Sequence, residues 1–128
     1  MATAASITGW VRAYLFRALR ACERPLYCDT DSIACARGVG LDLGPDLGQW
    51  KDEGHYYRAA IAGRKMYAFF GRDEKGAPAE KTASKGVTLS ADQIASIAAG
   101  QSVTARRDAP NFSVRFGRRY IEREIKAT

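Results

Sequence analysis

The stretch from Tyr27 to Ile33 constrains the fold of this chain more than any other part of the sequence. It reads YCDTDSI, so two carboxylates and two hydroxyls lie between apolar or β-prone residues. Short Asp and Ser side chains hydrogen-bond their own backbone and favour a turn. The segments on either side can pair as a short hairpin. We therefore predict a hairpin with Asp29 and Asp31 at its tip.

Asp29 and Asp31 are candidate metal ligands. They are two residues apart, so their side chains can lean to one face. Adjacent carboxylates repel each other, and a nearby cation compensates for the repulsion. Hard oxygen ligands of this kind suit Mg²⁺ or Mn²⁺. The alternative is a pair of solvated turn residues, and the acidic pair alone leaves both interpretations open.

The length and charge of the chain indicate a small basic domain. Its 128 residues suit one domain with a modest core. Twenty Lys and Arg against fourteen Asp and Glu give a net charge of +6, which favours a nucleic-acid partner over an ordinary basic surface. No apolar run approaches the roughly 18 residues needed to cross a membrane, so we expect no membrane partner and a cytoplasmic location. The three cysteines, Cys22, Cys28 and Cys35, lack metal-ligand spacing and are expected to be small buried residues.

Apolar periodicity predicts the remaining elements. A stripe at helical spacing predicts an amphipathic helix over 7–22, stopped by Pro25. A Gly-rich irregular connection follows Cys35, and two strands near 56–62 and 65–70 form a second hairpin. A loop is expected over 71–85 and a short helix over 90–99, opened by a capping box at Ser90 and Gln93. Further expectations are short strands over 101–105 and 112–116, a turn at 108–111, and a helical or frayed tail from 118.

These elements predict an α+β fold. The two hairpins would supply about four strands of a small, mainly antiparallel sheet that includes the hairpin carrying Asp29 and Asp31. The N-terminal amphipathic helix would pack on one face of this sheet, beneath the carboxylates. We expect one domain over 1–128.

The motifs resemble those of a known family. YCDTDSI resembles the Y-x-D-T-D-S signature of family-B DNA polymerases, which forms the palm hairpin that carries a catalytic carboxylate. Lys65-Met66-Tyr67 is similar to the K-x-Y motif of that family, and Ser84-Lys85-Gly86 looks like the lysine-glycine element near the palm–thumb junction. Residues 47–53 look like the strand that follows the hairpin in phage-type, protein-primed members, and residues 108–115 look like their C-terminal region. The resemblance implies that the single domain corresponds to the C-terminal palm and the palm–thumb junction.

The resemblance also implies roles for individual residues. Asp31 would be the principal catalytic, metal-binding carboxylate, and Asp29 would support it. Lys65 would neutralise the hairpin or touch primer phosphate, Tyr67 would buttress the primer terminus, and Lys85 would contact the duplex backbone. Basic residues cluster in the last quarter of the chain, and they are either a phosphate-tracking surface or a solvated face. We take three of them as candidate nucleic-acid ligands, namely Arg115, Arg118 and Arg119.

Two family motifs are missing, and this decides the functional prediction. Neither the D-x-x-S-L-Y-P-S element, with the second metal-bridging aspartate, nor the K-x-x-x-N-S-x-Y-G helix occurs here. We expect a fragment or split subunit that is inactive without a partner polymerase chain, binds DNA, and holds Mg²⁺ or Mn²⁺ only when the partner completes the site. Such a subunit would expose an apolar seam and act in the cytoplasm of a phage-infected or prophage-carrying bacterium. The alternatives are a phage-derived, non-enzymatic DNA-binding or inhibitor protein that acts on a host nucleoprotein complex, and a decaying gene remnant or an excised piece of a larger protein.

Overall fold

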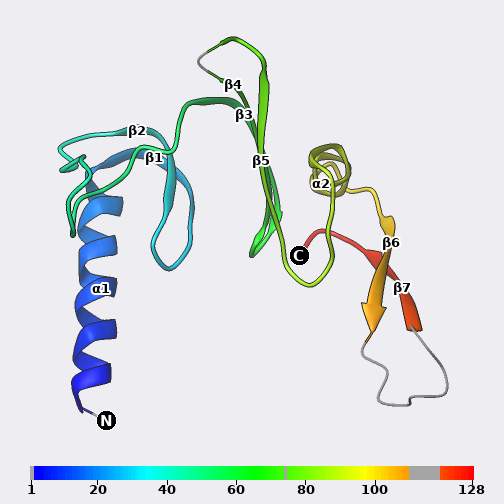
Figure 1. Cartoon of the computed structure of the whole chain (residues 1–128), viewed down its shortest axis with the longest axis horizontal. Coiled ribbons are helices and arrows are strands. Elements are labelled where there is room, and N and C mark those ends of the chain that lie inside the picture. The colour runs from blue at the N-terminus through cyan, green and yellow to red at the C-terminus, as the bar shows by residue number, and fades with distance from the viewer. Residues whose placement is uncertain (1, 74, 110–118) are drawn as a thin grey trace. The chain divides into compact units, whose positions relative to one another are not determined.

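The computed structural model describes residues 2–73, 75–109 and 119–128. Contacts divide the chain into two compact units, Met1–Glu53 and Gly54–Thr128, each described here by itself. In chain order the elements are α1 (Ala2–Ala21), β1 (Cys22–Cys28), β2 (Ile33–Gly38), β3 (Tyr56–Gly63), β4 (Met66–Arg72), β5 (Pro78–Ser84), α2 (Ala91–Ala98), β6 (Val103–Ala109) and β7 (Arg119–Ile125) (Figure 1). The expectation of one domain over 1–128 concerns how the two units act together, and it stays a prediction.

The α+β class is confirmed, because the chain has small antiparallel sheets, an N-terminal helix and a second short helix. The prediction that the two hairpins share one sheet was wrong. The described strands form separate sheets with the orders β1-β2, β3-β4-β5 and β6-β7. Each β-hairpin pairs through its own backbone, and a third strand joins only the central hairpin.

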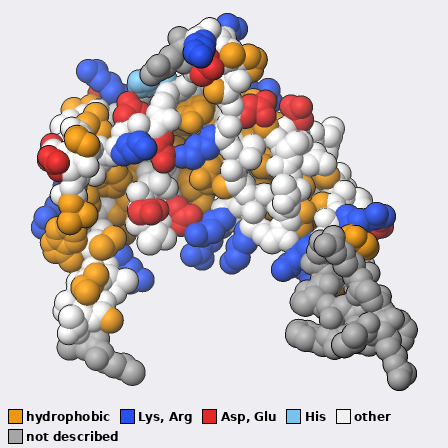
Figure 2. Space-filling view, in the orientation of Figure 1, with side chains coloured by type: hydrophobic (Ala, Val, Ile, Leu, Met, Phe, Trp, Pro, Cys, Tyr) orange, Lys and Arg blue, Asp and Glu red, His pale blue; other side chains and the backbone are white. Residues whose placement is uncertain are grey.

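Helix α1 confirms the predicted amphipathic helix, but only part of its apolar surface is buried. Its 20 residues make it about 30 Å long. Ala18, near its C-terminal end, is buried, whereas Ile7, Trp10 and Phe16 are 62%, 63% and 64% exposed. Figure 2 shows hydrophobic side chains at the surface of this helix. Among the described residues, no helix is long and apolar enough to span a membrane.

The helix ends at Ala21, before the expected stop at Pro25, and β1 begins at the next residue. Pro25 lies inside β1 and faces Cys35 of β2. Proline has no N–H to donate to the ladder, and the register shifts between Pro25 and Tyr27. The proline therefore marks an irregularity in the strand and not the end of the helix.

The Gly-rich connection after β2 is irregular, as predicted, and folds into a closed loop. Trp50 N donates to Asp42 O at 2.8 Å, and Gly44 N donates to Trp50 O at 3.0 Å. The Gln49 side chain accepts from Asp46 N at 3.0 Å and donates to the Asp42 carboxylate at 3.2 Å. Residues 47–53, which resembled a family strand, contain a turn and a single bridge at Trp50 and no strand.

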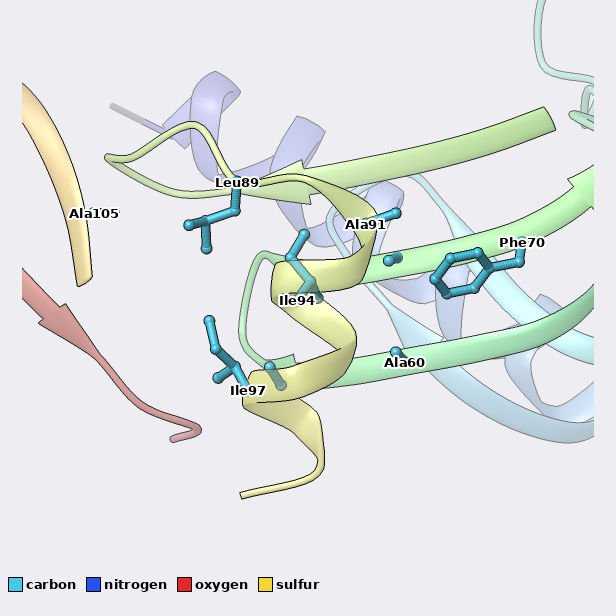
Figure 3. Close-up of a cluster of buried hydrophobic side chains, with 9 residues drawn as sticks. Ala60, Phe70, Leu89, Ala91, Ile94, Ile97 and Ala105 are labelled. Atoms are coloured by element: carbon cyan, nitrogen blue, oxygen red, sulfur yellow. The ribbon is translucent and has the colours of Figure 1, made fainter. Parts of the chain in front are cut away.

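The second unit is built on the β3-β4-β5 sheet, and α2 packs against β3 and β4. Ser90 and Gln93 form the predicted capping box, with the Gln93 amide donating to Ser90 Oγ at 3.3 Å and the Ser90 amide donating to Gln93 Oε1 at 2.9 Å. Ile94 and Ile97 are 0% exposed. Figure 3 shows them with Leu89 and Phe70, with Ala60 on the sheet and Ala105 on the neighbouring strand. Alanines on the sheet leave room for the two isoleucines of the helix.

Two segments of the second unit differ from their predictions. Residues 78–84 were expected to be loop, yet they form β5, which pairs with β4 from Met66↔Ser84 to Arg72↔Pro78. The tail was expected to be helical or frayed, yet it forms β7 against β6. In both cases pairing with a formed strand outweighs weak local propensity. The strand predicted over 112–116 and part of the turn predicted over 108–111 lie outside the described residues.

Replacing Ile97 with Ala should lower the free energy of unfolding of the second unit by about 2–5 kcal/mol, because the deleted atoms leave a cavity in a fully buried site. Urea unfolding followed by circular dichroism would measure this. Ile61→Ala in β3 is the matched control, since Ile61 is 37% exposed, and its cost should be clearly smaller. Equal costs at the two positions would contradict the core described here.

Candidate functional site

The tip of the β1–β2 hairpin carries both predicted carboxylates, as the sequence indicated. Cys28 pairs with Ile33, which leaves residues 29–32 for the turn. The Asp29 amide donates to Ser32 O at 3.0 Å and closes it. The hairpin therefore brings Asp29 and Asp31 into one four-residue turn.

The two carboxylates differ in their surroundings. Asp29 is half-buried, and its Oδ1 accepts hydrogen bonds from the Thr30 amide at 2.8 Å and from the Thr30 hydroxyl at 3.2 Å. Asp31 is exposed and makes no hydrogen bond or ion pair within the described part of the chain. Asp29 thus shapes the turn, while both oxygens of Asp31 are open to a ligand.

The carboxylate turn fits part of a magnesium site. Mg²⁺ is commonly held by one or two carboxylates, with water and substrate phosphates filling its other positions. Asp31 and Asp29 meet that minimum. The described residues contain no group of three or more His, Cys, Asp and Glu side chains that could enclose a metal ion. Any further ligands would have to come from outside the described structure.

An aromatic contact ties the Gly-rich loop to α1 in the first unit. Tyr14 stacks between Trp10 and Trp50, with ring centroids 5.4 Å apart in both pairs. The Tyr14 hydroxyl donates to Gly48 O at 2.6 Å. Trp10 and Tyr14 are spaced i, i+4, which places them on one helix face. The contact with Trp50 was not predicted.

The cysteines lie along the hairpin that carries the carboxylates. Cys22 is buried, Cys35 is half-buried, and Cys28 is exposed, so the expectation of buried cysteines was wrong for Cys28. Burial raises the pKa of the Cys22 thiol from 9.0 to about 11, and a hydrogen bond and charge interaction with Cys35 add to the shift. Cys22 therefore stays a protonated, inert thiol at neutral pH.

The predicted lysines and Tyr67 belong to the second unit. Lys65 lies in the turn before β4 and not on the strand, with a φ of 57° in the left-handed region. Tyr67 is half-buried on β4, and its ring centroid lies 4.9 Å from that of Phe69. Lys85 is exposed directly after β5. Because Met66 pairs with Ser84, Lys65 and Lys85 occupy the same end of the β3-β4-β5 sheet.

The predicted arginines of the last quarter are only partly described. Arg115 and Arg118 lie outside the described residues. Arg119 begins β7, where its backbone pairs with Ala109. Two other arginines, Arg106 and Arg107, lie on β6 and line an open pocket of about 500 Å³. The sequence alone did not set these two arginines apart from the rest of the basic cluster.

The motifs at and around the carboxylate hairpin resemble those of a portion of a phage-type family-B DNA polymerase, and a similar protein of this class is known. A DNA-directed DNA polymerase of Enterobacteria phage PRD1 is 37% identical over 155 residues, a match that covers 100% of this chain. This confirms the resemblance that the motifs predicted. The chain spans 28% of the length of that polymerase. No family model matches the chain, and no solved structure matches it.

Raising the pH from about 9 to about 11 should destabilise the first unit through Cys22. The thiol of the unfolded chain ionises near its ordinary pKa, whereas the folded thiol ionises about two units higher, so the unfolded state gains stability across this window. Below about pH 9 the contribution of Cys22 is complete. Thermal melts followed by tryptophan fluorescence would report this unit, since both tryptophans, Trp10 and Trp50, lie in it.

Cys22→Ala should remove part of this pH dependence, while Cys28→Ala, at an exposed position, should keep it. The difference between the two variants isolates the contribution of the Cys22 thiol. Identical pH profiles for the wild type and Cys22→Ala would contradict the assignment.

Proposed function

We propose that this chain is the part of a phage DNA polymerase that presents a metal-binding carboxylate turn and contacts DNA, and that it is catalytically incomplete by itself. The observation that carries the proposal is the exposed Asp31 at the tip of the hairpin, in a motif of a chain related throughout to a phage DNA polymerase. The chain spans 28% of that polymerase, and we assign the remaining catalytic groups to the parts outside this span.

Asp31 is the proposed principal ligand of Mg²⁺ or Mn²⁺, and Asp29 is the supporting one. The hydrogen bonds from Thr30 hold one oxygen of Asp29 in the turn, which keeps the turn in shape. When bound, the metal would neutralise charge on phosphate oxygens. Asp31 offers two acceptor oxygens to the ion, and Asp29 adds negative charge next to it.

The end of the β3-β4-β5 sheet is the proposed DNA-contacting part. Lys65 and Lys85 bring two positive charges to that end, and phosphates are the partners such charges favour. Tyr67 lies on β4, two residues after Lys65, and presents an aromatic ring that can support a nucleotide. Arg115, Arg118 and Arg119 stay candidate contacts to nucleic acid on the basis of their charge alone.

Catalytic incompleteness follows from the chemistry of phosphoryl transfer. Two-metal sites hold the attacking and leaving oxygens with carboxylates from several elements. The described part of the chain has no group of three or more His, Cys, Asp and Glu side chains that could hold a metal ion. The exposed side chains of Ile7, Trp10 and Phe16 on α1 support a contact with the remainder of the polymerase, on the same or another chain.

The exposed apolar side chains of α1 also suit a different protein partner, as in the alternative of a non-enzymatic inhibitor that binds a host nucleoprotein complex. The two functions differ in what they require of the carboxylates. A polymerase part needs Asp31, whereas an inhibitor or DNA-binding protein tolerates its replacement.

Asp31→Asn should abolish the dependence of primer–template binding on Mn²⁺, because the neutral amide is a much weaker ligand for a hard cation. A labelled primer–template duplex would be titrated with the purified chain at two salt concentrations, with Mn²⁺ or with a chelator. Salt-sensitive binding should persist in the variant, since it depends on the basic residues.

Glu23→Gln is the matched control, because Glu23 lies on β1 of the same hairpin and its replacement removes the same charge away from the tip. It should leave the Mn²⁺ dependence intact. Binding that never responds to Mn²⁺, or that responds equally in wild type and Asp31→Asn, would overturn the metal role and favour the non-enzymatic alternative.

A further inference from the structure

The open pocket of about 500 Å³ in the second unit lies between the loop after β5 and strand β6. Its lining among the described residues is Ser84, Gly86, Val87, Thr88, Arg106 and Arg107, which includes two arginines and no acidic residue. Arginine recognises phosphate through paired N–H donors. A lining of this kind, as far as the described residues form it, is suited to an anion.

The two arginines of the pocket are not equivalent. Arg106 donates to Glu122 across the β6–β7 pair at 3.0 Å, and its guanidinium lies 5.6 Å from the centre of the Tyr120 ring. Its charge is therefore already matched by a carboxylate. Within the described residues the side chain of Arg107 has no ion pair and no hydrogen bond, so its charge is available to a ligand.

Strand alternation explains this difference. Val103 and Ala105 face the core beside α2, and Arg107, two residues further along β6, continues on the same face. Arg106 points to the opposite face, where Glu122 lies directly across the ladder. Arg107 thus extends beyond the apolar core toward the loop after β5, and its guanidinium lies 3.8 Å from the position that a Cβ on Gly86 would occupy.

The loop facing Arg107 has a fixed shape. The Ser84 hydroxyl donates to Val87 O at 2.6 Å and accepts from the Leu89 amide at 3.3 Å. Gly86 has a φ of +83°, in the left-handed region that disfavours side chains. Because Gly86 has no side chain, the Arg107 guanidinium faces the backbone of this loop. Lys85, the preceding residue, adds an exposed positive charge.

We infer that this pocket binds a backbone phosphate of a nucleic acid, that Arg107 is the residue that grips it, and that Arg106 serves the fold. The inference deepens the proposed function and rests on it, since it takes the ligand to be nucleic acid. It adds a contact to Lys65 and Lys85, which occupy the same end of the β3-β4-β5 sheet as Ser84 and Gly86.

Arg107→Gln should weaken binding of a labelled DNA duplex about tenfold at low salt, the effect of losing one charged hydrogen-bonding contact. It should also reduce the slope of log affinity against log salt concentration by about one. Arg106→Gln is the matched control, because it removes the same charge from the adjacent residue, and it should change affinity less than about twofold and leave the slope unchanged.

Equal losses of affinity in the two variants would mean that only the overall charge matters, and this would overturn the inference. The absence of any loss of affinity in Arg107→Gln would also overturn it. A parallel titration with inorganic phosphate distinguishes the source of the ligand. Phosphate binding that depends on Arg107, with duplex binding that does not, would make this a free-anion pocket and would overturn the nucleic-acid assignment.

The same titrations separate this inference from the proposed function. Duplex binding that needs Arg107 but shows no Mn²⁺ dependence on Asp31 would retain the pocket and reject the metal role. Mn²⁺-dependent binding that is indifferent to Arg107 would do the reverse. A wild-type chain that does not bind duplex DNA at all would overturn both.

Discussion

The pairing of Cys28 with Ile33 limits the first hairpin to a four-residue turn, and the candidate metal chemistry depends on this limit. A longer loop would let the two carboxylates move apart and relieve their repulsion. Here both carboxylates belong to one four-residue turn, in which Thr30 holds one oxygen of Asp29 and Asp31 is exposed. The same turn thus contains one carboxylate with a structural task and one that is open to solvent. Chemically similar side chains acquire different roles from backbone geometry alone.

The second unit obtains its shape from small side chains on the sheet and large ones on the helix. Ala60, Ala62 and Ala68 are buried on β3 and β4 beneath α2, where Ile94 and Ile97 are fully enclosed. This arrangement lets a short helix lie close to the sheet, and it uses one sheet face for the core. The strand ends and the loop after β5 then remain at the surface, where Lys85, Gly86 and Arg107 lie. The core and the basic pocket are therefore consequences of the same strand alternation.

Sequence patterns predicted the local elements better than their assembly. The turn at Asp29–Ser32, the capping box at Ser90 and the apolar stripe of α1 are all set by neighbouring residues, and each was predicted. Strand β5 was not, because PAEKTAS has weak strand propensity and becomes a strand by pairing with β4. The difference between Arg106 and Arg107 was also inaccessible, since it depends on Glu122 across the ladder and on the loop at Gly86. Contacts of this kind join segments distant in sequence, and a period or a motif carries no information about them.

The register of β4 against β5 has a consequence for how such chains can diverge. Met66 faces Ser84, and the two strands are connected at their other ends around residues 73–77. Residues can be gained or lost in that connection without moving Lys65 relative to Lys85, whereas a single insertion within β5 would turn every following side chain to the opposite face. The match to the PRD1 polymerase extends over 155 residues while this chain has 128, so the two sequences differ in length over the matched part. A change of length in the connection around residues 73–77 would leave the positions of Lys65 and Lys85 unchanged. Relatives are therefore expected to differ in length there and to keep the strand spacing that ends at the two lysines.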